Sequence, residues 1–150
     1  MNNPLKSKAS HDLGLLLVRI PMGAYFFLAG LGKVQHGVGN FEAAMIGKVP
    51  EWTPHPLGQA FLYALPFMEM LVGILLVFGL LTRVGGLIGS LLLISFMIAV
   101  TGFHDASNPG LPFHANSIFL GITLLLMLAG GGDLSADRFV LRKRGGGNAN

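Results

Sequence analysis

Two charged side chains inside long apolar runs are the residues of this chain best suited to chemistry. Arg19 lies in the run Leu13–Gly32, and Glu69 lies in the run Gln59–Leu81. Ionisable groups are costly inside a lipid bilayer, so a charge retained there marks a functional site by default. A carboxyl group in such a place can accept or donate a proton during a reaction. Glu69 is therefore the leading candidate for a catalytic proton carrier.

The depth of the two charges in their runs suggests how they could meet. At about 1.5 Å per helical residue, Glu69 lies about 15 Å below the outer end of its run and Arg19 about 9 Å from the inner end. In a hydrocarbon core about 30 Å thick they are then about 6 Å apart vertically. Two interpretations follow. Either Arg19 and Glu69 form an ion pair that only fixes helix packing, or they belong to a functional polar pocket.

Further polar residues gather near the outer ends of the runs. Lys33 ends the first run, where it either extends to the outer interface or faces the mouth of a pocket around Glu69. His36, His104 and His114 also belong to the outer side, as does Asn116. The histidine spacing matches no metal signature, so we expect neither a metal site nor a haem. They are then ordinary loop residues, or one of them transfers a proton or binds a ligand carbonyl.

The elements that must position these residues are four apolar helices. The runs Leu13–Gly32, Gln59–Leu81, Gly85–Phe103 and Asn116–Gly131 are close to the roughly 20 residues that a membrane crossing needs. Charged residues make up only 11% of the chain, against about 25% in soluble domains. We predict an all-α integral membrane four-helix bundle over residues 13–135. Residues 1–12 are expected to be mobile, and residues 136–150 to form a short basic interfacial helix and a disordered tail.

The placement of basic residues predicts the orientation. Most lysines and arginines lie at one end of the predicted helices: Lys6, Lys8, Arg83, Arg138, Arg142, Lys143 and Arg144. Only Lys33 and Lys48 lie in the opposite connections. The positive-inside rule then places both termini in the cytoplasm of a multi-pass bacterial inner-membrane protein. We expect the first run to be a retained helix rather than a cleaved signal peptide. This distribution does not favour nucleic-acid binding.

The connections are predicted from turn residues and small residues. Phe41–Lys48 is expected to form a short interfacial helix, whereas three prolines should keep residues 50–56 from regular helix. Gly85 and Gly89 form a small-xxx-small pattern, which lets neighbouring helices approach closely.

The absence of cysteine limits the cofactors. It removes thiolate zinc sites, iron–sulfur clusters and covalent haem attachment. The chain also lacks the nucleophile-elbow, zinc-protease and phosphate-loop motifs. We therefore expect no covalently bound cofactor.

Four stretches of the chain together resemble the DoxX family of small bacterial membrane proteins, over about residues 13–140. They are Val18-Arg19 leading to Gly30-Leu31-Gly32-Lys33, Glu69 followed by Gly73–Leu76 and Gly79–Arg83, Asn116, and Gly130–Asp137. The resemblance implies four transmembrane helices. One branch of the family is similar to the membrane subunit of thiosulfate:quinone oxidoreductase, which passes electrons to quinone. Other members are partners of redox enzymes or have no assigned activity.

By this resemblance, a shared polar pocket should contain Arg19, Lys33, Glu69 and Asn116. The connection His104–His114 departs from the family pattern, and we add His104 to the candidate ligand-binding residues. We expect the pocket to open to the periplasm and to bind a quinone-type or small polar ligand, with Arg19 beneath it as counter-charge. Because the chain brings no visible electron-carrying cofactor, a partner subunit would have to supply electrons. We expect a partner subunit or a homo-oligomer in the lipid bilayer. The alternatives are a non-catalytic structural or assembly subunit and, less favoured, a small transporter.

Overall fold

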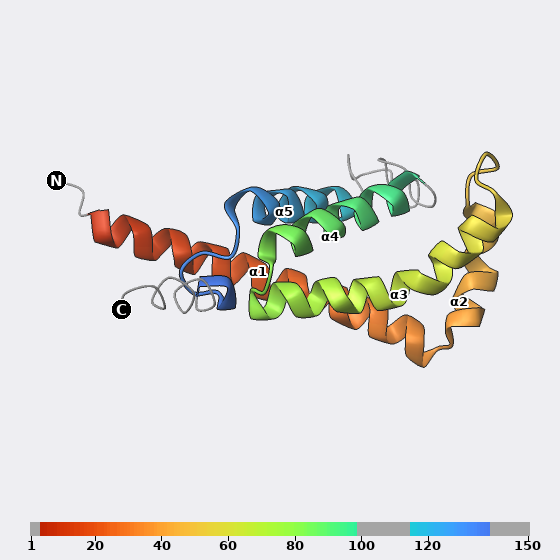
Figure 1. The fold of residues 1–150 in the computed structure, drawn as a ribbon, viewed down its shortest axis with the longest axis horizontal. Coiled ribbons are helices and arrows are strands. Elements are labelled where there is room, and N and C mark those ends of the chain that lie inside the picture. Colours follow the sequence, from red (N-terminus) through yellow and green to blue (C-terminus); the bar gives the residue numbers. More distant parts are fainter. Residues whose placement is uncertain (1–3, 99–114, 139–150) are drawn as a thin grey trace, which may run out of the picture.

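The protein is built from helices that run along one another. The computed structural model describes residues 4–98 and 115–138, and these contain no strand. The elements are α1 (Pro4–Gln35), α2 (Val38–Met45), the 3-10 helix η1 (Ile46–Lys48), α3 (His55–Phe78), α4 (Thr82–Phe96) and α5 (Ala115–Ala129). Figure 1 shows α1, α3, α4 and α5 lying lengthwise along the long axis of the molecule, with α2 at one end. The prediction of an all-α fold is confirmed.

Two of the helices are long and apolar enough to cross a membrane. They are the 28-residue stretch Lys8–Gln35 of α1 and the 24-residue α3, whose most apolar 18-residue windows have mean hydropathies of 1.7 and 2.2. The shorter helices α4 and α5 are also apolar, and at 15 residues each they are about 22 Å long. Many large apolar side chains point outward, among them Leu17, Leu28, Phe78 and Leu128, each more than 60% exposed. Exposed apolar surface of this extent is typical of a membrane or partner contact.

The helices α1 and α3 pack with their backbones almost touching. A Cβ atom on Gly73 would lie 2.5 Å from the Phe27 nitrogen and 2.7 Å from the Gly23 carbonyl oxygen. Nearer the α2 end, Gly30 lies against the carbonyl of Pro66. These contacts fix an antiparallel register, in which α1 residues near 23 meet α3 residues near 73 and residues near 30 meet residues near 66.

The second close contact joins α4 to α5. A Cβ atom on Gly86 would lie 2.6 Å from the Met127 nitrogen, and one on Gly89 would lie 3.3 Å from the Thr123 methyl group. Gly85 faces Leu76 of α3 instead. The prediction of close helix approach from the glycines at the start of this run is confirmed. A core of buried side chains lies between the helices, including Phe26, Leu65, Val72, Leu76, Leu92 and Leu126.

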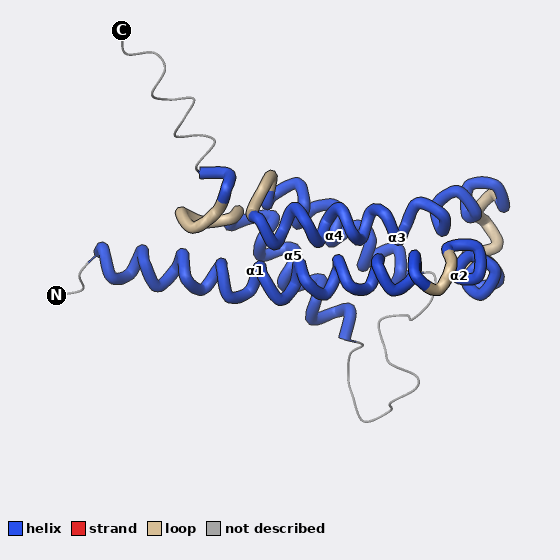
Figure 2. The backbone as a smooth tube through the Cα atoms, turned by 90° about the horizontal axis from the view of Figure 1, so that it is seen from below, coloured by secondary structure: helices blue, strands red, loops and turns tan. Residues whose placement is uncertain are grey.

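The ends of several elements differ from the sequence prediction. The helix α1 begins at Pro4, so residues 4–12, expected to precede the first helix, are its first turns. Figure 2 shows α1 as one continuous helix. The Asp12 carboxylate accepts a hydrogen bond from the Asp133 backbone N–H at 3.0 Å, which ties this extension to the segment after α5. The helix α3 includes Pro56, because a proline in the first turn needs no N–H donor.

The connections agree with the sequence prediction more closely than the helix ends do. The helices α2 and η1 together occupy residues 38–48, where a short helix was expected. A helical turn begins at Ala136, as predicted, and is described as far as Arg138. The third apolar run was expected to continue to Phe103, but residues 99–103 lie outside the described residues.

Candidate functional site

A bidentate ion pair joins the end of α1 to the middle of α3. The Lys33 Nζ lies 2.7 Å from Oε1 and 2.5 Å from Oε2 of Glu69. The two side chains are only 19% and 10% exposed, so the pair is largely shielded from its surroundings. The ammonium group also lies 5.4 Å from the centre of the Phe41 ring of α2, within cation–π range. The register of α1 on α3 creates this pair, since it brings the last turn of α1 alongside Pro66 and Met70.

The pair borders a small cavity whose other walls are apolar except at Tyr25 and Asn116. Its volume is about 70 Å³, and α1, α3, α4 and α5 all contribute to it. Besides Lys33 and Glu69, its lining consists of Tyr25, Phe26, Ala29, Leu92, Leu93, Phe96 and Asn116. Of the residues predicted to bind a ligand, Lys33, Glu69 and Asn116 therefore lie at one cavity. His104, like His114, lies outside the described residues, and its place in the site stays a prediction.

Arg19 does not belong to this cavity. Its Nη1 donates a hydrogen bond to the Gly131 carbonyl at 2.8 Å, and its Nη2 donates to the Leu134 carbonyl at 3.1 Å. The residue is 2% exposed and lies against Gly79, at the turn between α3 and α4. Gly79 follows Glu69 by ten residues, or about 15 Å along a helix. Of the two interpretations, the Arg19–Glu69 ion pair is therefore wrong, and so is the placement of Arg19 as a counter-charge beneath the pocket.

Comparison with known proteins identifies the family. The family model described as DoxX matches residues 14–105. The chain belongs to the DoxX family. This confirms the resemblance that the sequence motifs indicated, and with the two long apolar helices it makes the chain a helical membrane protein of that family.

Two relatives of this DoxX protein match over nearly their whole length. A Bacillus subtilis (strain 168) protein named "Putative oxidoreductase CatD" is 32% identical over 143 residues, which are 93% of this chain and 96% of the relative. An Escherichia coli (strain K12) protein named "Inner membrane protein YqjF" is 31% identical over 141 residues, which are 91% of this chain and 98% of the relative. No solved structure matches the chain.

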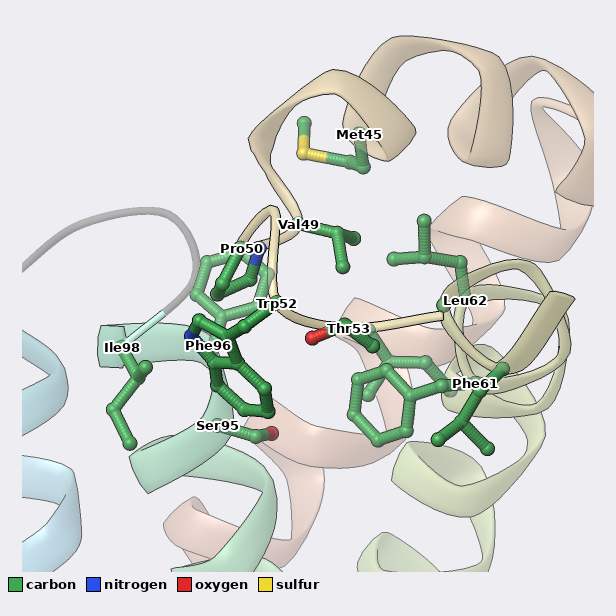
Figure 3. Close-up of a pocket in the computed structure, with 13 residues that line it drawn as sticks. Met45, Val49, Pro50, Trp52, Thr53, Phe61, Leu62, Ser95, Phe96 and Ile98 are labelled. Atoms are coloured by element: carbon green, nitrogen blue, oxygen red, sulfur yellow. The ribbon is translucent and has the colours of Figure 1, made fainter. Parts of the chain in front are cut away.

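A second, larger cavity in this DoxX protein was not predicted. Its volume is about 380 Å³, and it lies between the connection after η1, the first turns of α3 and the end of α4 (Figure 3). Val49, Phe61 and Leu62 are among its lining residues, together with Phe96, which lines the small cavity as well. The sequence signal was weak, because the lining comes from three separate segments. The prolines of the connection had suggested only an irregular loop.

Proposed function

We propose that this DoxX protein is a four-helix bundle that crosses the bacterial inner membrane four times, with both termini in the cytoplasm. The helices α1 and α3 have the length for a crossing, and α4 and α5 pack along each other beside them. Lys8 and Arg138 both pair with Asp133, so the described ends of the chain share one end of the molecule. Lys33 and Lys48 lie towards the opposite end, which matches the positive-inside rule. The name of the Escherichia coli relative as an inner membrane protein supports the location.

We further propose that Lys33 and Glu69 bind one polar group of a quinone-type ligand and handle the proton that accompanies its reduction. The observation that carries this proposal is a shielded Lys–Glu pair beside a cavity, with Glu69 in the middle of the long apolar helix α3. Charged residues in membrane helices are expensive and commonly serve proton transfer or ligand binding. The name of the Bacillus subtilis relative, as a candidate oxidoreductase, supports redox chemistry.

The chemistry of the pair suits a carbonyl oxygen. An ammonium group has three N–H donors, and the Glu69 carboxylate accepts from the Lys33 Nζ through both of its oxygens. The third N–H is available for a carbonyl at the cavity. Reduction of a quinone to a quinol takes up two electrons and two protons. In our proposal a partner oxidoreductase subunit supplies both electrons, and the Lys33–Glu69 pair delivers one proton to the oxygen that it binds. Water supplies the proton for the other oxygen and the proton that recharges the pair.

The first experiment is to purify the protein with its native lipids and to quantify quinone that remains bound. We expect retained quinone in the wild type and its loss in Glu69→Gln. A matched control is Glu42→Gln, because Glu42 is also a buried carboxylate and accepts a hydrogen bond from Gln59. Glu42→Gln should keep the quinone. A wild type without quinone, together with a Glu69→Gln variant that still complements a deletion strain, would contradict the proposal.

The second candidate function is a structural or assembly subunit of a larger membrane complex. It is favoured by the close packing at Gly73 and Gly86, and by an ion pair that is already complete without a ligand. Co-purification of stoichiometric large subunits, unchanged by Glu69→Gln, would support this function over the redox one. A stable assembly whose mass is a multiple of the chain mass would indicate a homo-oligomer, which is also compatible with a structural function.

A further inference from the structure

The small cavity alone cannot contain a ring-sized ligand. Its volume of about 70 Å³ corresponds to roughly two water molecules at about 30 Å³ each. Small-molecule sites usually measure about 300–1,000 Å³, a range into which only the larger cavity of about 380 Å³ falls. A ligand bound at Lys33 and Glu69 must therefore place most of its atoms elsewhere.

The two cavities lie one above the other along the contact between α3 and α4. On α3, Leu62 and Leu65 line the large cavity, and Glu69, one turn further on, lines the small one. Four residues of helix correspond to about 6 Å. On α4, Phe96 lines both cavities. The cavities are thus neighbours on both helices, and the Phe96 ring lies where they meet.

The walls of the two cavities differ in chemistry. The large cavity is lined by carbon except at a few places such as the hydroxyls of Thr53 and Ser95, and the Ser95 hydroxyl donates to the Leu92 carbonyl. Figure 3 shows Phe61, Leu62 and Phe96 around this space. The small cavity offers the ammonium and carboxylate of the pair. Together they match an amphipathic molecule that is apolar along its body and polar at one end.

We infer that the large cavity holds the apolar body of a lipophilic ligand whose carbonyl or hydroxyl end reaches the Lys33–Glu69 pair past Phe96. This inference rests on the proposed function, because it assigns the rest of the same ligand. Phe96 then acts as a positioning residue that determines how far the ring enters. The large cavity then discriminates between ligands by the shape of their apolar body, and the Lys33–Glu69 pair discriminates by the polarity of their end group.

The single tryptophan of the chain gives a direct test, since Trp52 lines the large cavity. The full chain is placed in lipid nanodiscs, and menadione, a compact apolar quinone, is titrated while saturable quenching of Trp52 fluorescence is followed. Thr53→Phe adds an aromatic ring at the cavity, and we expect it to weaken binding about tenfold. Ala60→Phe adds the same ring on the exposed side of α3, at a similar depth, and should bind menadione like the wild type.

A second measurement does not depend on a variant. A photoreactive azidoquinone is activated on the wild-type protein, and the labelled residues are located by mass spectrometry. Labels on the segments Met45–Leu57 and Ser95–Ile98 would support the inference, and labels confined to other helices would overturn it.

The outcomes separate this inference from the proposed function. If Thr53→Phe binds menadione normally while Glu69→Gln does not, the polar site stands and the large cavity is not where the ligand body lies. If the wild type shows no saturable quenching and no specific label, both the inference and the proposed function fail. Weakening by Thr53→Phe and not by Ala60→Phe supports both.

Discussion

Each end of this DoxX protein holds a shielded cation, buried Arg19 at one end and partly buried Lys33 at the other, and the two cations have different kinds of partner. At one end Arg19 donates to the backbone carbonyls of Gly131 and Leu134. At the other end Lys33 donates to a side-chain carboxylate, that of Glu69, beside a cavity. No cavity described in the structure includes Arg19 among its lining residues.

The contrast shows that intramembrane charge alone does not identify a functional site. Arg19 connects α1 to the segment that follows α5, and its neighbour Gly79 has no room for a side chain. Its hydrogen-bond acceptors are backbone carbonyls, which do not change their protonation. We therefore interpret Arg19 as a structural residue. The carboxylate that holds Lys33 can change its protonation and its partner. The Lys33 end therefore carries our functional proposals, and the following predictions test this division.

The largest effect is expected from Arg19→Met. The substitution leaves the buried carbonyl of Gly131 and the carbonyl of Leu134 without their donor, and such orphaned groups cost about 1–3 kcal/mol each. We expect the free energy of unfolding to fall by about 3–5 kcal/mol, as when one partner of a buried polar contact is removed. Unfolding in mixed micelles with increasing denaturing detergent measures this change. A loss below about 1 kcal/mol would remove Arg19 from its structural role.

The second effect concerns the Lys33–Glu69 pair, and it has two arms. Lys33→Met alone leaves the Glu69 carboxylate without its cation. Because the pair is partly exposed, we expect the free energy of unfolding to fall by about 2 kcal/mol. The double variant Lys33→Met, Glu69→Leu replaces the pair with apolar groups and should return to within about 1 kcal/mol of the wild type. It should still abolish quinone retention. If the double variant is as unstable as Arg19→Met, the pair is a structural element like Arg19.

The comparison of the two ends also shows what the sequence could predict. The apolar runs located α1, α3, α4 and α5. The glycines at the start of α4 indicated a close helix contact, but the closest approach is made by Gly86 and not by the Gly85–Gly89 pair. The partner of Glu69 could not be predicted, because it depends on the register of α1 against α3, and the carbonyl partners of Arg19 lie in the segment after α5. That register is set by contacts such as Gly23 with Gly73, and counting from the ends of the runs does not reveal it.

The candidate site was predicted in part for a related reason. Glu69 and Lys33 stood out as charged residues within or next to apolar runs, and the resemblance to the family placed them in one pocket with Asn116. Phe96 and Trp52 are apolar residues in an apolar chain, and nothing in their spacing marks them as cavity residues. Only the fold, which brings three separate segments together, reveals the large cavity.

A smaller effect is expected from Asp137, which stabilises the Arg19 end in another way. Its carboxylate accepts hydrogen bonds from the Leu81 and Thr82 backbone N–H groups, at 2.5 and 2.9 Å, and so caps the start of α4 from a distant segment. Leu81 has a positive φ of 48°, which costs energy in a residue with a side chain. Asp137→Ala should lower stability by about 1 kcal/mol, the usual value of a helix cap.

Amide hydrogen exchange checks the Asp137 prediction at the residues concerned. Exchange at Leu81 and Thr82 should become faster in Asp137→Ala, while exchange near Glu69 stays unchanged. Quinone retention should also persist, because the cap belongs to the other end of the molecule. Loss of quinone in this variant would show that the two ends are coupled and would break the division between them.

The smallest effect is expected at the surface of the same end, where Lys8 pairs with Asp133 at 2.8 Å. The two side chains are 57% and 31% exposed, and exposed ion pairs contribute about 0–1 kcal/mol. Lys8→Ala should therefore change the free energy of unfolding by no more than about 0.5 kcal/mol, and less at high salt. The matched variant Asp12→Ala removes a shielded acceptor for the Asp133 backbone N–H and should cost more. If Lys8→Ala costs as much as Asp12→Ala, charge attraction rather than backbone hydrogen bonding holds the first turns of α1 to the segment after α5.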